Sequence, residues 1–126
     1  MSLKIDILKQ NDYLLVTVSG KVVNTEEHKL LVDKLISEII ENRVIKMVLN
    51  IEDVEFEKSV LSLLDIVDYY GSEHSGIFKS ITLAVVLKPS MEPLAEVWLY
   101  AAKENGYNCK IFNSDVEAIT FILNSE

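Results

Sequence analysis

The chain has 126 residues, of which 49% are apolar and 25% charged, and only two are prolines; this is the length and composition of one compact globular domain over residues 1–126. Twelve basic against twenty acidic residues give a net charge of −8, which disfavours nucleic acid and anionic membrane surfaces as partners. One cysteine and no long apolar run exclude a disulfide framework and a membrane-spanning helix, so we expect a soluble, untargeted protein of the reducing cytoplasm.

Two strands and a helix are predicted in the first third of the chain. Apolar and charged residues alternate over residues 3–8, and a β-branched run over 13–18 follows a turn, which predicts an antiparallel hairpin. Asn24 with Glu27 three residues later is the pattern of a capping box, so a helix should begin there and end near Asn42. Its inward stripe is predicted to be Leu31, Val32, Leu35, Ile36, Ile39 and Ile40.

The middle of the chain reads as a strand, a helix and a second strand. Residues 46–51 form a short apolar strand, and an acidic segment over 52–57 is expected to lead from it into a helix over about 59–70. A loop is expected over 71–79. The near-continuous apolar run over 80–87 is typical of a central strand that is covered on both faces.

The last third reads as a helix, a strand and a final helix. Pro89 marks the first helix entry and Gly106 the position after its end, where positive φ is needed. A strand over 109–112 precedes Ser114 and Glu117, a second capping-box pair. The inward positions are predicted to be Leu94, Val97, Trp98, Ala101 and Ala102 in the first helix and Val116, Ile119, Phe121, Ile122 and Leu123 in the second.

The element order ββαβαβαβα predicts an α/β fold. Helix-length connections between successive strands require right-handed parallel crossovers. We therefore expect a mainly parallel sheet of about five strands in roughly sequential order, with an antiparallel first strand at one edge and four helices. The residues expected to be buried are Leu35, Leu64, Val85, Trp98 and Ile119.

Catalytic chemistry is hard to find in this sequence. The four glycines are not spaced to wrap a phosphate at a strand-to-helix turn, so nucleotide hydrolysis is excluded. We interpret His28 and His74 as two solvated histidines and Cys109 as a small buried apolar side chain. Asn50 stands where the phosphoacceptor aspartate of a receiver domain would be, which excludes that interpretation. We expect no enzyme activity, no metal site and no cofactor.

Several strings in a fixed order resemble the STAS family, the anti-sigma-factor antagonist or SpoIIAA-like domains, across nearly the whole chain. The strings are Val16 to Val22, Lys46 to Phe56, Ser80 to Leu87 and Cys109 to Ala118. The resemblance implies a SpoIIAA-like fold and a phosphoacceptor serine at the start of the second helix, which corresponds to Ser59. Lys58 and Leu61 replace the aspartate and glycine of the family pattern, which marks a divergent member.

The resemblance also implies a function, that of a non-catalytic regulatory module that binds a protein partner, an anti-sigma factor or a kinase-like regulator, with a homodimer as a further arrangement. A phosphate on Ser59 would lie near backbone donors and Lys58, whereas an ordinary N-cap is the alternative role of this serine. The acidic segment is either a partner surface or a solvated loop. A different function, a small carrier of a lipophilic ligand, is the alternative for the whole chain. The predicted partner-binding residues are Asp53, Glu55, Glu57, Lys58, Ser59, Ser62 and Asp65.

Overall fold

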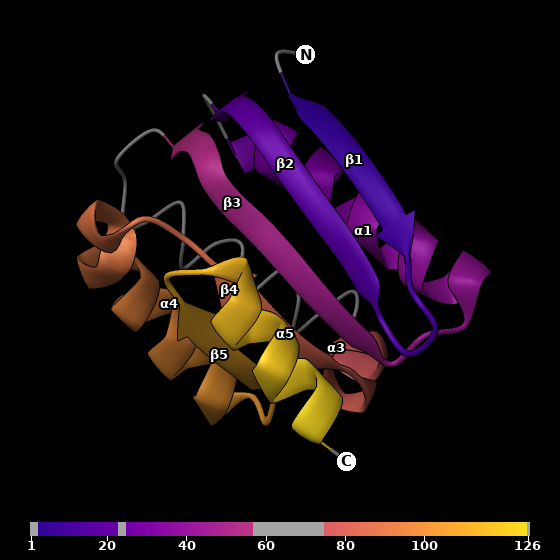
Figure 1. The fold of residues 1–126 in the computed structure, drawn as a ribbon. Coiled ribbons are helices and arrows are strands. Elements are labelled where there is room, and N and C mark those ends of the chain that lie inside the picture. Colours follow the sequence, from indigo (N-terminus) through magenta and orange to yellow (C-terminus); the bar gives the residue numbers. More distant parts are fainter. Residues whose placement is uncertain (1–2, 23–24, 57–74, 126) are drawn as a thin grey trace.

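The computed structural model describes residues 3–22, 25–56 and 75–125, in which five strands form one sheet (Figure 1). The strand order is β1-β2-β3-β4-β5, with β1 antiparallel to β2 and all other neighbours parallel. The predicted sequential sheet with an antiparallel edge strand is therefore confirmed. The strands are β1 (Lys4–Lys9), β2 (Leu14–Val22), β3 (Lys46–Phe56), β4 (Thr82–Val86) and β5 (Asn108–Phe112).

Three of the four predicted helices are present in the described ranges as α1, α4 and α5, and the fourth, expected over about 59–70, lies outside them. A loop was predicted over 71–79, but residues 75–80 form a short helix, α3. A helix of six residues is unfavourable by itself and forms through tertiary contacts, so a sequence pattern does not reveal it. The helical segments are α1 (Thr25–Asn42), α3 (Ser75–Ser80), η1 (Pro89–Met91), α4 (Glu92–Glu104) and α5 (Asp115–Asn124).

The sheet separates two clusters of buried side chains. The larger cluster joins the sheet to α1 and α4, and the smaller one joins it to α5. In Figure 1, α5 accordingly lies on the opposite side of the sheet from α1. No helix in the described part of the chain is long and apolar enough to cross a membrane.

Within the described ranges, the hairpin of β1 and β2 is covered mainly on the face of α1. Its inward side chains, such as Val16 and Val18, lie in the larger cluster and are fully buried. Thr17 and Ser19 therefore point toward the α5 side, as do the residues opposite them in β1, Asp6 and Lys4. By contrast all five residues of β4 are buried, which confirms the prediction of a central strand covered on both faces.

Glycine at position 106 ends α4 as the sequence predicts. Its φ is +78°, in the left-handed region that glycine adopts without a steric penalty. The backbone N–H of Gly106 donates to the carbonyl of Lys103 (3.0 Å), and that of Tyr107 donates to Ala102 (3.0 Å). These two bonds are the Schellman pattern, which satisfies carbonyl groups at the end of the helix.

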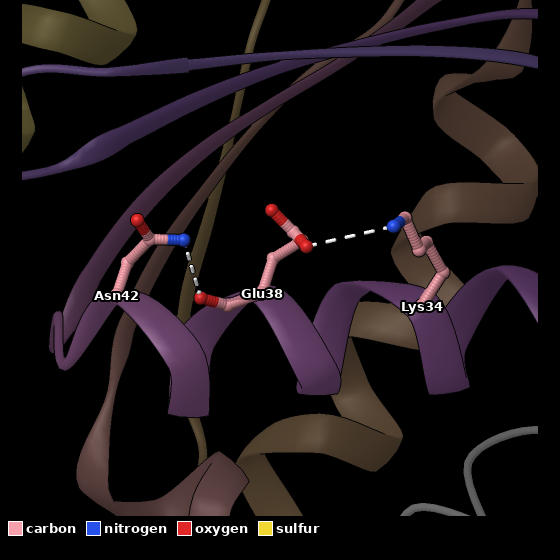
Figure 2. A network of polar contacts seen from close by, with 3 residues as sticks. All are labelled: Lys34, Glu38 and Asn42. Carbon is pink, nitrogen blue, oxygen red and sulfur yellow. Dashed lines mark hydrogen bonds and ion pairs between the residues drawn. The ribbon is translucent and has the colours of Figure 1, made fainter.

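The end of α1 is stabilised by polar side chains instead of glycine. Figure 2 shows the side-chain amide of Asn42 donating to the backbone carbonyl of Glu38 at 2.9 Å, while Lys34 lies 3.5 Å from the Glu38 carboxylate. Arg43, the next residue, has a φ of +55°. The helix therefore ends at Asn42, as predicted, although a non-glycine residue adopts the left-handed conformation.

The predicted core residues have mixed outcomes. Leu35 and Val85 are buried, Ile119 is half-buried, and Leu64 and the side chain of Trp98 lie outside the described part. The predicted apolar stripes are too wide, because three of the members whose side chains the structure describes are exposed. These are Ile40 at 58%, Val116 at 74% and Leu123 at 52%.

The contact between α5 and the sheet explains the exposed members of its stripe. Ala118 and Ile122 are fully buried against the sheet. Successive residues of an α-helix are rotated by about 100°, so Leu123 points well away from Ile122. A helix that touches a sheet on one side buries only the narrow centre of a wide apolar stripe.

We expect Ile122→Ala to lower the free energy of unfolding by about 2–5 kcal/mol, because it leaves a cavity in a fully buried position. Leu123→Ala, its neighbour in the same helix, should change that free energy by about 0.5 kcal/mol or less, since Leu123 is half-exposed. Urea denaturation of both variants measures the difference. Equal losses would show that α5 is rotated relative to the sheet.

Candidate functional site

A β-bulge in β3 decides which side chains of its second half face the core. Thr17 of β2 is opposite Asn50, whereas Ser19 is opposite Asp53, so β3 has one more residue than β2 between these pairs. Because side chains alternate between the two faces of a strand, one extra residue exchanges the faces of every residue beyond it. A regular strand would direct Asp53 into the larger cluster. The bulge instead directs Val54 there, where it is fully buried.

The bulge leaves three carboxylates of β3 on the α5 side of the sheet. Asp53 and Glu55 are opposite Ser19 and Lys21 of β2, and both acidic side chains are exposed. Glu52 is half-buried and belongs to the hydrogen-bond network with α5 described next. We call Glu52, Asp53 and Glu55 the β3 acidic surface. It lies in the second half of β3, toward the end at which parallel α/β sheets usually bind ligands.

The side-chain amide of Asn50 connects this surface to α5. Its Nδ2 donates to Oδ1 of Asp115 (2.8 Å) and to Oε1 of Glu52 (3.1 Å), and its Oδ1 accepts from the backbone N–H of Glu52 (2.9 Å). All three residues are half-buried. One amide group therefore separates two carboxylates and joins the bulge to the first residue of α5.

The start of α5 is capped by the residues that the sequence singled out. Ser114 is the N-cap, and its hydroxyl accepts from the backbone N–H of Glu117 (3.3 Å) and donates to the Glu117 carboxylate (3.2 Å). The predicted pairing of Ser114 and Glu117 is thus confirmed. Asp115 and Glu117 also place negative charge in the first turn, where the helix dipole favours it.

The structure describes two of the seven predicted partner-binding residues, Asp53 and Glu55, and places both on the same face of β3. The other five, which include the proposed phosphoacceptor, lie outside the described residues: Glu57, Lys58, Ser59, Ser62 and Asp65. The expectation that the acidic segment only connects a strand to a helix is wrong for residues 52–56. These residues are part of β3, and most of them pair with β2.

Three residues of the site, Asn50, Glu52 and Asp115, are not among the predicted partner-binding residues. The alternation of Asp53, Val54 and Glu55 is a period-two signal that could have extended the predicted strand. The contact between Asn50 and Asp115 joins positions 65 residues apart, so no local pattern contains it. Among the described residues, no three His, Cys, Asp or Glu side chains are grouped so that they could hold a metal ion.

Burial changes the titration of two candidate groups. Cys109 is buried, and desolvation raises the pKa of its thiol to about 12, which confirms it as a small buried side chain. The interpretation of His28 as solvated is wrong, because its side chain is half-buried in the first turn of α1. Burial lowers its pKa from 6.5 to about 4, since the charged imidazolium is poorly solvated there. His74 lies outside the described residues.

The sheet order, the antiparallel edge pair and the helices on both faces define a SpoIIAA-like fold, as the resemblance implied. The structure is similar to an anti-sigma factor antagonist from Mycobacterium paratuberculosis, with a TM-score of 0.65 and 17% identity over 98% of this chain and 96% of that one. It is also similar to an uncharacterised DUF3478 protein with a SpoIIAA-like fold from Shewanella loihica, with a TM-score of 0.61 and 18% identity over 96% of this chain and 93% of that one. No protein-family model and no curated protein matches the sequence.

The Asn50 network predicts a pH-dependent effect of Asn50→Asp. The substitution removes the amide donor and places a third carboxylate between Glu52 and Asp115, so we expect the free energy of unfolding at pH 7 to fall by about 1–3 kcal/mol. Mutual repulsion of the ionised carboxylates would cost free energy in the folded variant. Protonation then relieves the repulsion, so the loss should shrink as the pH falls from 7 toward 4.

Urea denaturation over this pH range measures the effect, and Asn108→Asp is the matched control. Asn108 donates to the hydroxyl of Thr82 (3.2 Å), a partner without charge. Its substitution should therefore show much less recovery at low pH. A loss in Asn50→Asp that is independent of pH would contradict the proximity of the three carboxylates.

The lowered pKa of His28 predicts a loss of stability in acid. Between pH 6.5 and 4 the unfolded chain binds a proton at this residue and the folded chain does not, so stability falls as the pH falls through this window. We expect His28 to contribute about 2–3 kcal/mol to the free energy of unfolding above pH 6.5, and this contribution should be lost at pH 4 and below. His28→Gln cannot titrate, so the stability difference between wild type and variant should change by this amount between pH 7 and 4. A constant difference would contradict the burial of the imidazole.

Proposed function

We propose that this chain is a non-catalytic regulatory module, one cytoplasmic domain that binds a protein partner through the β3 acidic surface and the segment that follows it. The observation that carries the proposal is the bulge in β3, which brings Glu52, Asp53 and Glu55 to one face and leaves Asp53 and Glu55 in solvent. Like charges gathered in this way repel one another. They attract a basic surface and accelerate its association.

The SpoIIAA-like fold adds support for a protein partner, since one structurally similar protein is an anti-sigma factor antagonist. We propose that the contact continues into residues Glu57, Lys58, Ser59, Ser62 and Asp65, and that Ser59 accepts a phosphate. An anti-sigma factor or a kinase-like regulator is the kind of partner proposed. A phosphate on Ser59 would add about −1.5 to −2 charges next to an already acidic surface and so change the affinity for a basic partner.

Reversal of charge on the β3 acidic surface tests the proposal. The wild-type chain, immobilised and exposed to extract of its own cells, should capture a partner, and the affinity for the identified partner should fall as salt rises. Asp53→Lys with Glu55→Lys should weaken the measured affinity at least about tenfold. Lys58→Glu with Ser59→Asp should weaken it as well, with the circular dichroism spectrum unchanged.

Asp33→Lys with Glu41→Lys is the matched control for the charge reversal. Both residues are exposed on α1, on the opposite side of the sheet, and their reversal changes the net charge by the same amount. Equal effects of the two charge reversals would show that only net charge matters and would refute the surface. Mass spectrometry of the chain isolated from its cells tests phosphorylation separately, since Ser59→Ala should remove the modification.

A further inference from the structure

One flank of α5 and the uncovered face of the hairpin meet at an apolar surface that the proposed function does not use. Leu8 of β1 is 55% exposed, and the half-buried Leu15 of β2 is directly opposite it. On α5, Leu123 and Val116 are 52% and 74% exposed, and Ile119 is half-buried. We call these five residues the hairpin–α5 surface.

The geometry of α5 shows that its exposed apolar residues are on the side toward the hairpin. The ring of Phe121 lies 5.4 Å from that of Phe112 in β5, so this flank of the helix faces β5. Leu123 is rotated from the buried Ile122 by about 100° in the opposite sense, and Ile119 and Val116 lie on that same flank. Most contacts of α5 with the sheet are to β3, β4 and β5. The flank of Leu123 therefore faces β2 and β1, across the sheet face that is uncovered in Figure 1.

An apolar pair at this position is unusual for the solvated face of a hairpin. Side chains of a strand point alternately to the core face and to the solvated face, and those on the solvated face are normally polar, as in the neighbouring pair Asp6 and Thr17. Leu15 packs against the smaller core cluster, so the apolar surface extends from that cluster out to Leu8. Exposed apolar residues that are contiguous with a core and rimmed by polar ones mark interaction sites.

The charges around the hairpin–α5 surface select its occupant. On the same side of the sheet, near the second half of β3, five carboxylates stand against the ammonium groups of Lys4 and Lys21, and Lys4 is already 4.0 Å from Asp6. The five are Asp6, Glu52, Asp53, Glu55 and Asp115. This side also carries Lys46, which donates to the carbonyl of Ser125 at the end of α5, and Lys110, which lies over the ring of Phe121 on the β5 flank. A second copy of this chain would bring another net charge of −8 to this acidic rim. A basic partner is electrostatically favoured instead.

We propose that the hairpin–α5 surface binds an amphipathic, basic α-helix of a partner protein. The apolar side of that helix packs on Leu8, Leu15 and Leu123, and its basic side chains face Asp53 and Glu55. From Leu15 to Lys21, β2 spans about 20 Å, the length of a helix of about 13 residues. The apolar contact consists of β1, β2 and α5, but its basic side rests on Asp53 and Glu55 of the β3 acidic surface, so the proposal rests on that part of the proposed function and names the kind of partner. It does not depend on residues 57–65.

Titration of the ¹⁵N-labelled full chain with an 18-residue helical peptide of leucine and lysine tests the proposal. We expect amide shifts to change at Leu8, Leu15, Ile119 and Leu123, with a dissociation constant that rises with salt. Leu123→Ser and Leu8→Ser should each weaken binding about tenfold. Both side chains are half-exposed, so both variants should fold, which circular dichroism checks. Ile40→Ser, a substitution of equal exposure on α1 across the sheet, should leave the affinity unchanged.

Each other outcome overturns the proposal in its own way. Equal binding of a leucine–glutamate peptide of the same length would refute the basic partner. Equal weakening by Ile40→Ser would show unspecific binding. A dimer seen by light scattering and abolished by Leu123→Ser would show that a second copy of the chain occupies the surface. Laurate that changes the shifts of the same amides and binds more tightly than the peptide would show that a lipophilic ligand occupies it. Lys58→Glu with Ser59→Asp should not affect the peptide, so the proposed contact at residues 57–65 can fail while this surface stands.

Discussion

The extra residue in β3 is the constraint on which the rest of this side of the molecule depends. Up to Asn50 the strand alternates in step with β2, and beyond the bulge the alternation is inverted, so that Val54 fills the larger cluster while Asp53 and Glu55 remain in water. Asn50 holds this irregularity in place through Asp115, because its one amide group accepts from the bulge backbone and donates to carboxylates of β3 and α5. Strand register, helix position and surface charge are thus parts of one arrangement.

The two faces of the sheet are covered unequally because of the position at which α5 is held. The helix begins beside Asn50 and ends beside Lys46, whose ammonium group donates to the carbonyl of Ser125 at 2.8 Å. It therefore runs alongside β3 and β4 and, as far as the described residues go, leaves most of the outer face of the hairpin uncovered. Acidic side chains at one end of that face and leucines at the other give it an amphipathic character, which suits an amphipathic ligand better than either a purely charged or a purely apolar one.

Much of the fold could be predicted because its signals are local. The period-two pattern of β1 and β2, the apolar run of β4, the Ser114–Glu117 pair and Gly106 each act over a few residues, and all of them are confirmed. The candidate site was predicted only in part. Asp53 and Glu55 are predicted because of their charge. The same charge makes residues 52–57 resemble a connecting loop, so the extension of β3 that positions the two residues is not predicted. The role of Asn50 has no local signal, since its partner Asp115 is distant in the sequence.

The sequence by itself determined the element order, the antiparallel edge pair, the sequential sheet and the ends of α1 and α4, because hydrophobic periodicity and capping residues act locally. Only the tertiary structure decided which members of each apolar stripe are buried, since this depends on the width of the contact between a helix and the sheet. It also decided the faces of Asp53, Val54 and Glu55, because these follow from the register of β3 against β2. Register is a relation between two strands, and neither strand contains it alone.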